Sequence, residues 1–210
     1  MLPKPERAEI NYHTSRLIVG IIALTLATIT SLLTKNPLNS ISAAYWEPGP
    51  SHVVFIGFLF AIAAFLLAYN GHNTLDMILA RIAAIAAVGV AWFPCNCGPN
   101  SELGAQTLHL LSAGAMFLVL AYFAYGFFQE ASKKRRNPKP EDGRPTPRAA
   151  IYGICALAIL VAIAAFVLPI VIRVPASDIF PNYVFVWEAV ALHAFGAAWL
   201  VANRRVPGLN

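Results

Sequence analysis

Two ionisable side chains, His109 and Glu188, are the strongest candidates for chemistry in this sequence. Each lies near the start of a long apolar stretch, where hydrocarbon disfavours an isolated charge. Glu188 lies about five residues into its stretch, roughly 8 Å along a helix, so its carboxylate must be paired, protonated or in contact with water. A histidine and a carboxylate at one membrane face could serve as an acid/base pair or as metal ligands.

Other polar residues near the same predicted outer face extend this candidate site. Tyr45 and His52 flank the start of the second apolar stretch, and Ser112 follows His109 on one helical face. Together with His109 and Glu188 they predict a ligand-binding pocket, in which Tyr45 would orient a substrate. The alternative is that these residues simply meet water at the interface, and for His52 we favour this alternative.

Arg81 is a further ligand-binding candidate, on the opposite side of the membrane. It lies about six residues into the third apolar stretch, near Asp76. It could face the bundle interior and bind an anionic group. Its long side chain could equally reach the headgroups and form a local ion pair, and we favour this second interpretation.

Cysteine and histidine provide weaker metal-ligand candidates. Cys95 and Cys97 lie in a proline-flanked loop on the predicted outer side, and could form a labile disulfide or bind a soft metal such as copper(I). His193 could join His52 and His109 in a three-histidine zinc site. Depth argues against that site, because His193 lies roughly 15 Å along its helix and the other two lie at the rim. The sequence therefore identifies no cofactor and no firm metal site.

These side chains must be positioned by helices that cross a membrane. The chain has 210 residues, of which 58% are hydrophobic and 12% charged, and the charges fall between long apolar blocks. A crossing helix needs about 20 apolar residues, and these blocks are too long and too continuous for membrane strands. The sequence predicts one all-α domain, 1–210, with six transmembrane helices. The predicted spans are roughly 15–33, 52–69, 75–93, 108–128, 149–172 and 183–202.

Basic residues predict the orientation of these spans. Segment 129–148 carries seven Lys and Arg residues, the N-terminal segment carries three more, including Arg16, and the tail carries two. Because cytoplasmic loops are enriched in Lys and Arg, we expect both termini and a basic linker at 129–148 to be cytoplasmic. Such a local cluster indicates contact with anionic lipid rather than with nucleic acid.

The chain from about residue 40 onward resembles a known family. Residues 42–94 combine a Ser-x-x-Tyr loop at Ser42 and Tyr45, an F-x-G-x-L-F-A helix, a Tyr-x-Gly turn and an Ala-x-Phe-Pro ending. With later stretches that include His109 and Glu188, they resemble an uncharacterised bacterial family of six-span membrane proteins. That family is distantly similar to the superfamily of damage-regulated autophagy modulators and FGF-receptor-activating proteins. The resemblance implies a multi-pass protein of the bacterial inner membrane, and it transfers no activity.

Three functions are compatible with these patterns. The first is a non-enzymatic membrane protein, an accessory subunit of a larger complex or a lipid-interacting scaffold, because standard catalytic and nucleotide-binding motifs are absent from the sequence. The second is a membrane-embedded enzyme that acts on a lipid or small hydrophobic substrate at the outer face through His109 and Glu188. The third is a small-molecule transporter, disfavoured because no repeat is evident. We favour the first, and whether the chain is an enzyme stays open.

Overall fold

Helices make up every regular element in the part of the chain that the structure describes, residues 12–69, 71, 73–96, 102–136 and 147–202. Within these residues, the computed structural model has six helices that are long and apolar enough to cross a membrane. They are α1 (Tyr12–Leu32), α2 (Pro50–Leu67), α3 (Thr74–Trp92), α4 (Leu103–Arg136), α5 (Arg148–Ile172) and α7 (Tyr183–Ala202), and the connecting segments contain η1 (Ile41–Tyr45) and α6 (Ala176–Ile179). The predicted all-α architecture of six long apolar helices is therefore confirmed.

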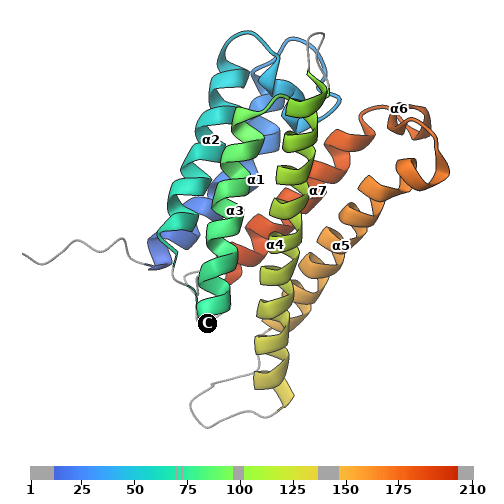
Figure 1. The fold of residues 1–210 in the computed structure, drawn as a ribbon. Coiled ribbons are helices and arrows are strands. Elements are labelled where there is room, and N and C mark those ends of the chain that lie inside the picture. The colour runs from blue at the N-terminus through green and yellow to red at the C-terminus, as the bar shows by residue number, and fades with distance from the viewer. Residues whose placement is uncertain (1–11, 70, 72, 97–101, 137–146, 203–210) are drawn as a thin grey trace, which may run out of the picture.

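The six long helices form a closed ring (Figure 1). Each contacts the next along the chain from α1 to α5, and α7 completes the ring by contacting both α5 and α1. The short helix η1 lies against α1, α2 and α7 at one end of the bundle. We call this the η1 end, and it corresponds to the predicted outer face. The other end, where α1 begins and α7 finishes, is called the Arg16 end.

Local sequence features, a proline in the first turn or an N-cap residue, mark the start of three helices. Pro50 occupies the first turn of α2, where its missing N–H costs nothing. Asn73 caps α3, because its Oδ1 accepts a hydrogen bond from the N–H of Asp76 at 2.9 Å. Ser40 caps η1 in the same way, and its Oγ accepts the N–H of Ala43 at 3.0 Å.

Glycines allow two pairs of helices to approach closely. A Cβ atom at Gly196 of α7 would lie 2.9 Å from the carbonyl oxygen of Gly20 in α1. A Cβ atom at Gly89 of α3 would lie 2.9 Å from Cβ of Ser112 in α4. Within a membrane, such close backbone contact supplies much of the packing energy between helices.

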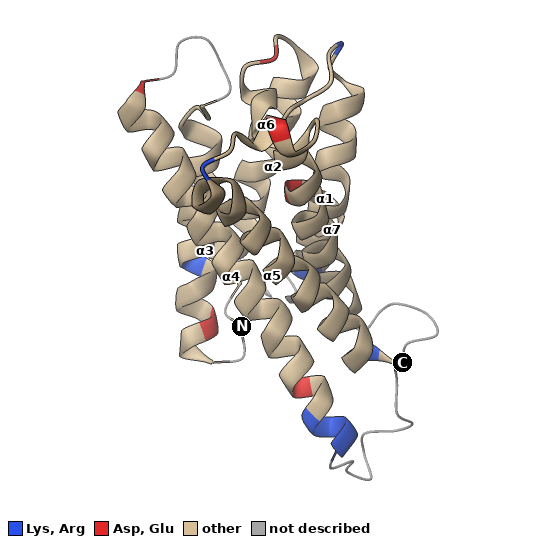
Figure 2. Ribbon diagram, turned by 90° about the vertical axis from the view of Figure 1, so that its right-hand side faces the viewer, with Lys and Arg blue, Asp and Glu red and all other residues tan. Residues whose placement is uncertain are grey.

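The fourth helix is longer than its predicted span, 108–128. α4 has 34 residues, which corresponds to about 51 Å, and its charged end extends beyond the neighbouring helices (Figure 2). Residues 129–136, the first part of the predicted cytoplasmic linker 129–148, are therefore helical. The Gln, Glu, Ala, Lys and Arg residues there are strong helix formers that extend an existing helix, and the basic last turn favours the helix dipole. Residues 137–146 of that predicted linker lie outside the described residues, and its last residue, Arg148, begins α5.

Candidate functional site

Glu188, in the second turn of α7, is bonded to the first turn of η1. Its Oε2 accepts a hydrogen bond from the N–H of Ile41 at 2.5 Å, and its Oε1 accepts one from the hydroxyl of Ser42 at 3.4 Å. The first N–H groups of a helix lack partners within that helix, and a carboxylate is favoured there. One turn earlier, Phe185 N–H donates to the carbonyl of Asn39 at 3.0 Å. Glu188 therefore helps to fasten η1 to α7.

The segment after α3 is also attached to η1. The indole N–H of Trp46 donates to the carbonyl of Cys95 at 3.2 Å, and the hydroxyl of Tyr45 donates to the carbonyl of Trp92 at 3.4 Å. The Sγ atom of Cys95 lies 3.3 Å from the carbonyl oxygen of Ser42. Cys95 is disulfide-bonded, so it takes the disulfide rather than the thiolate form that soft-metal binding requires.

The start of α2 completes the attachment of η1. The Nδ1–H of His52 donates to the carbonyl of Tyr45 at 2.5 Å, and the two rings pack edge to face with centroids 5.4 Å apart. The neighbouring Ser51, fully buried, donates its hydroxyl to the carbonyl of Thr30 in α1 at 2.9 Å. The predicted ligand-binding residues Tyr45 and His52 thus contact each other and hold α2 against the loop.

His109 and Ser112 attach α4 to α3. His109 is buried, and its Nδ1–H donates to the carbonyl of Phe93 at 2.8 Å, where α3 ends. Carbonyl groups at the end of a helix lack partners within it, so this bond satisfies an acceptor that would otherwise need water. Ser112 packs against Gly89 one turn further along the same face. Both candidate residues therefore take part in packing between helices.

The two predicted catalytic residues share the η1 end but bond to different elements. Glu188 bonds the first turn of η1, whereas His109 bonds the end of α3. No hydrogen bond joins their two side chains, which are both described. They are connected indirectly, through the contact of Cys95 with Ser42 and the short backbone segment from Phe93 to Cys95. The arrangement joins loops and helix ends at one end of the bundle.

Within the described ranges, no group of three or more His, Cys, Asp or Glu side chains is placed to hold a metal ion. His193 donates its Nδ1–H to the carbonyl of Ala189 in its own helix, at 2.6 Å. The other two members of the predicted zinc site, His52 and His109, each bond a backbone carbonyl. Cys97, the second cysteine of the predicted soft-metal motif, lies outside the described residues.

Arg81 is exposed on the surface of α3. Its neighbour along the helix, Asp76, accepts a hydrogen bond from the hydroxyl of Tyr122 in α4 at 3.2 Å. An exposed arginine within a membrane-crossing helix can extend its charged group to the headgroups. This exposed position suits a side chain that reaches the headgroups, and the ligand-binding role of Arg81 stays a prediction.

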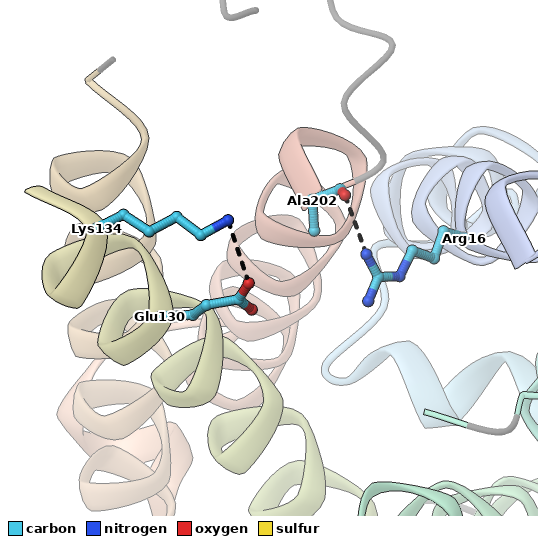
Figure 3. A network of polar contacts seen from close by, with 4 residues as sticks. All are labelled: Arg16, Glu130, Lys134 and Ala202. Atoms are coloured by element: carbon cyan, nitrogen blue, oxygen red, sulfur yellow. Dashed lines mark hydrogen bonds and ion pairs between the residues drawn. The ribbon is translucent and has the colours of Figure 1, made fainter. Parts of the chain in front are cut away.

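Arg16 is an interior residue, although its position in the sequence indicated only a topology signal. It is 4% exposed, and its Nη1 donates to the carbonyl of Ala202 at 3.0 Å (Figure 3). Its Nη2 donates to the hydroxyl of Tyr69, also at 3.0 Å. Its guanidinium carbon lies 5.2 to 5.7 Å from the ring centroids of Tyr69, Phe127 and Trp199. Such placement over aromatic faces is a cation–π arrangement.

This cluster, Arg16 with Tyr69, Phe127, Trp199 and Ala202, connects α1, the turn after α2, α4 and α7. Burial raises the pKa of the Tyr69 phenol to about 12, so its hydroxyl stays protonated at neutral pH. No local pattern could have identified the cluster, because its aromatic members come from three separate segments. No protein-family model, curated protein or solved structure matches this chain.

Proposed function

We propose that this chain is a non-enzymatic integral membrane protein that acts as a lipid-interacting scaffold or an accessory subunit of a membrane complex. The observation that carries the proposal is that the polar side chains at the η1 end form hydrogen bonds with the backbone. Glu188, His109, His52 and Tyr45 all bond backbone groups of packed elements. A general acid or base needs its reacting atom within reach of a substrate proton. The bonds of these side chains fix the positions of η1 and of the helix ends, and this is the role that the proposal assigns to them.

The apolar surface of the bundle supports the same proposal. Large hydrophobic side chains on α4 and α5 are exposed over the length of both helices, so they need lipid or a partner to cover them. Examples are Leu110, Leu118, Ile154, Leu157, Leu160 and Ile170, which are all more than half exposed.

Association is the property to measure. We would extract the full chain from membranes in a mild detergent and analyse it by native mass spectrometry, with chemical cross-linking before extraction. The expected result is a retained protein partner or a set of retained lipids. The same association is expected for folded His109→Gln and Glu188→Gln variants, since these residues serve the fold. A solitary monomer that carries neither partner nor lipid would contradict the proposal.

We also propose that the Arg16 end faces the cytoplasm of a bacterial inner membrane. The support is the charge bias of the sequence, since the basic last turn of α4 lies at this end. Reporter fusions after Arg136 and within the loop after α1 would test the orientation. Activity of a cytoplasmic reporter at the loop after α1 would contradict it.

A membrane enzyme is the second candidate function. The observation in its favour is that His109 and Glu188 lie at the same end of the bundle and are linked through Ser42 and Cys95. The test is conversion of a membrane lipid extract by the purified protein. Turnover that is lost in both Glu188→Gln and His109→Gln, with the fold retained, would establish the enzyme and overturn the scaffold proposal.

A further inference from the structure

The last turn of α4 carries four consecutive cations, which we call the basic collar: Lys133, Lys134, Arg135 and Arg136. All four side chains are exposed. Consecutive residues on a helix are separated by about 100°, so four of them point around most of the helix circumference. Figure 2 shows this charged end projecting below the neighbouring helices. The collar therefore presents positive charge in most directions around the end of α4.

The position of the basic collar along α4 can be measured from Phe127, the last buried aromatic residue of this helix. Phe127 is 8% exposed and contacts the rings of Trp199 and Tyr152, with centroids 5.6 Å away in both cases. The collar begins six residues later and ends nine residues later, which is about 9 to 14 Å further along the helix axis. A headgroup layer occupies roughly the 5 to 8 Å beyond the hydrocarbon on each side. The collar thus lies just beyond a headgroup layer that begins near Phe127. Because side chains on a helix lean toward its N-terminus, long Lys and Arg side chains there can reach back to lipid phosphates.

Within residues 129–136, internal pairing leaves most of the collar charge uncompensated. Between 129 and 136, Glu130 is the one acidic residue in the sequence. Its Oε1 lies 3.7 Å from Nζ of Lys134, one helical turn later (Figure 3). Both side chains are about half exposed. Four cations and one carboxylate leave a formal charge of +3 on this segment. A surface ion pair of this kind is weak, so it does not prevent Lys134 from contacting another anion.

We propose that the basic collar is a binding site for the headgroups of anionic phospholipids. The proposal rests on the lipid-interacting function proposed above and names the class of lipid. Charge complementarity selects a phosphate-bearing anion, and the level of the collar selects one that belongs to the bilayer. The collar continues a helix that crosses the membrane, so anionic headgroups are its nearest neighbours at this level. Their attraction to the collar is electrostatic and therefore depends on ionic strength.

The test measures lipid selectivity of the full chain in reconstituted bilayers. We would compare spin-labelled phosphatidylglycerol with spin-labelled phosphatidylcholine in the motionally restricted lipid at the protein surface. The expected preference for phosphatidylglycerol is about fivefold at low salt. It should fall toward equality when all four collar residues are changed to Gln, or when salt rises from about 0.05 to 0.5 M. A matched control exchanges Lys133 and Lys134 for Arg, and Arg135 and Arg136 for Lys, and should keep the preference.

Two results would overturn the proposal. One is an unchanged preference in the four-Gln variant, and the other is no preference in the wild type. In the second case, tight binding of a short oligonucleotide by the wild type in detergent would assign the collar to a soluble polyanion. Each of these leaves unaffected a retained protein partner, which is one of the two expected results in the test of the proposed function. Conversely, turnover at the η1 end would overturn the scaffold without changing lipid selectivity at the other end of α4.

Discussion

The carboxylate of Glu188 accepts a hydrogen bond from the N–H of Ile41 at 2.5 Å, although 147 positions separate the two residues. This bond joins the last long helix to the short loop helix that lies against α1, α2 and α7. A carboxylate in a membrane-crossing helix needs a partner, and the first turn of η1 supplies donors that themselves need an acceptor. This one hydrogen bond therefore provides a partner both for the carboxylate of Glu188 and for an N–H group at the start of η1.

Replacing Glu188 with Ala should destabilise the fold. The substitution removes the acceptor of Ile41 N–H and Ser42 Oγ–H, and a half-buried donor without a partner costs about 1 to 3 kcal/mol. Thermal unfolding in detergent measures this loss. The control is Glu130→Gln, which removes an exposed ion pair and should change stability by less than about 0.5 kcal/mol. Equal effects of the two variants would show that the bond to η1 is unimportant.

Replacing Arg16 with Gln should loosen the Arg16 end of the bundle. The variant loses the bonds to Ala202 and Tyr69 and the aromatic contacts, a combined cost of about 2 to 3 kcal/mol. The Arg16→Lys variant should recover part of the lost stability, because the lysine ammonium group keeps the positive charge but lacks the planar guanidinium group with its several donors. Hydrogen exchange in the last turn of α7 is the measurement. Arg81→Gln, at an exposed site, is the control, and matching exchange rates in the two variants would count against the cluster.

Adding a methyl group at Gly196 should separate α1 from α7. Its Cβ would lie 2.8 Å from Cγ of Leu24 and 2.9 Å from the carbonyl of Gly20, and overpacking of this kind costs about 1 to 3 kcal/mol. Gly114→Ala is the matched control, because a Cβ there meets nothing within 4 Å. Thermal unfolding of both variants tests the contact. A Gly196→Ala variant as stable as Gly114→Ala would contradict it.

The six-helix architecture could be predicted because hydrocarbon requires every crossing segment to satisfy its own backbone hydrogen bonds. Long apolar blocks therefore had to be helices, and each predicted span overlaps one of them. The helical end of α4 was missed for a physical reason. Residues 129–136 are polar, and polarity marks where a span leaves the membrane without marking where its helix ends. The sequence places Pro138 shortly after this helix, and proline was the better guide to its end.

The residues of the candidate site could be predicted from the sequence, but their hydrogen-bond partners could not. The sequence identified Glu188, His109, His52 and Tyr45 as polar groups near one face, and all four lie at the η1 end. Their partners are mostly backbone groups of segments distant in the chain, and no residue type or spacing encodes such a pairing. The same applies to Arg16, whose aromatic neighbours become adjacent when the ring of helices closes.

A double-mutant cycle on His109 and Glu188 can distinguish the scaffold from the enzyme, because it measures whether the two side chains interact in the folded protein. Each single Gln variant is expected to destabilise the fold by about 1 kcal/mol, since each loses or weakens a bond to a different element. Because the two residues share no partner, the double variant should be additive within about 0.5 kcal/mol. Denaturation of the four proteins in detergent gives the coupling energy directly. A coupling above about 1 kcal/mol would mean that the two side chains act on each other, as an acid/base pair would.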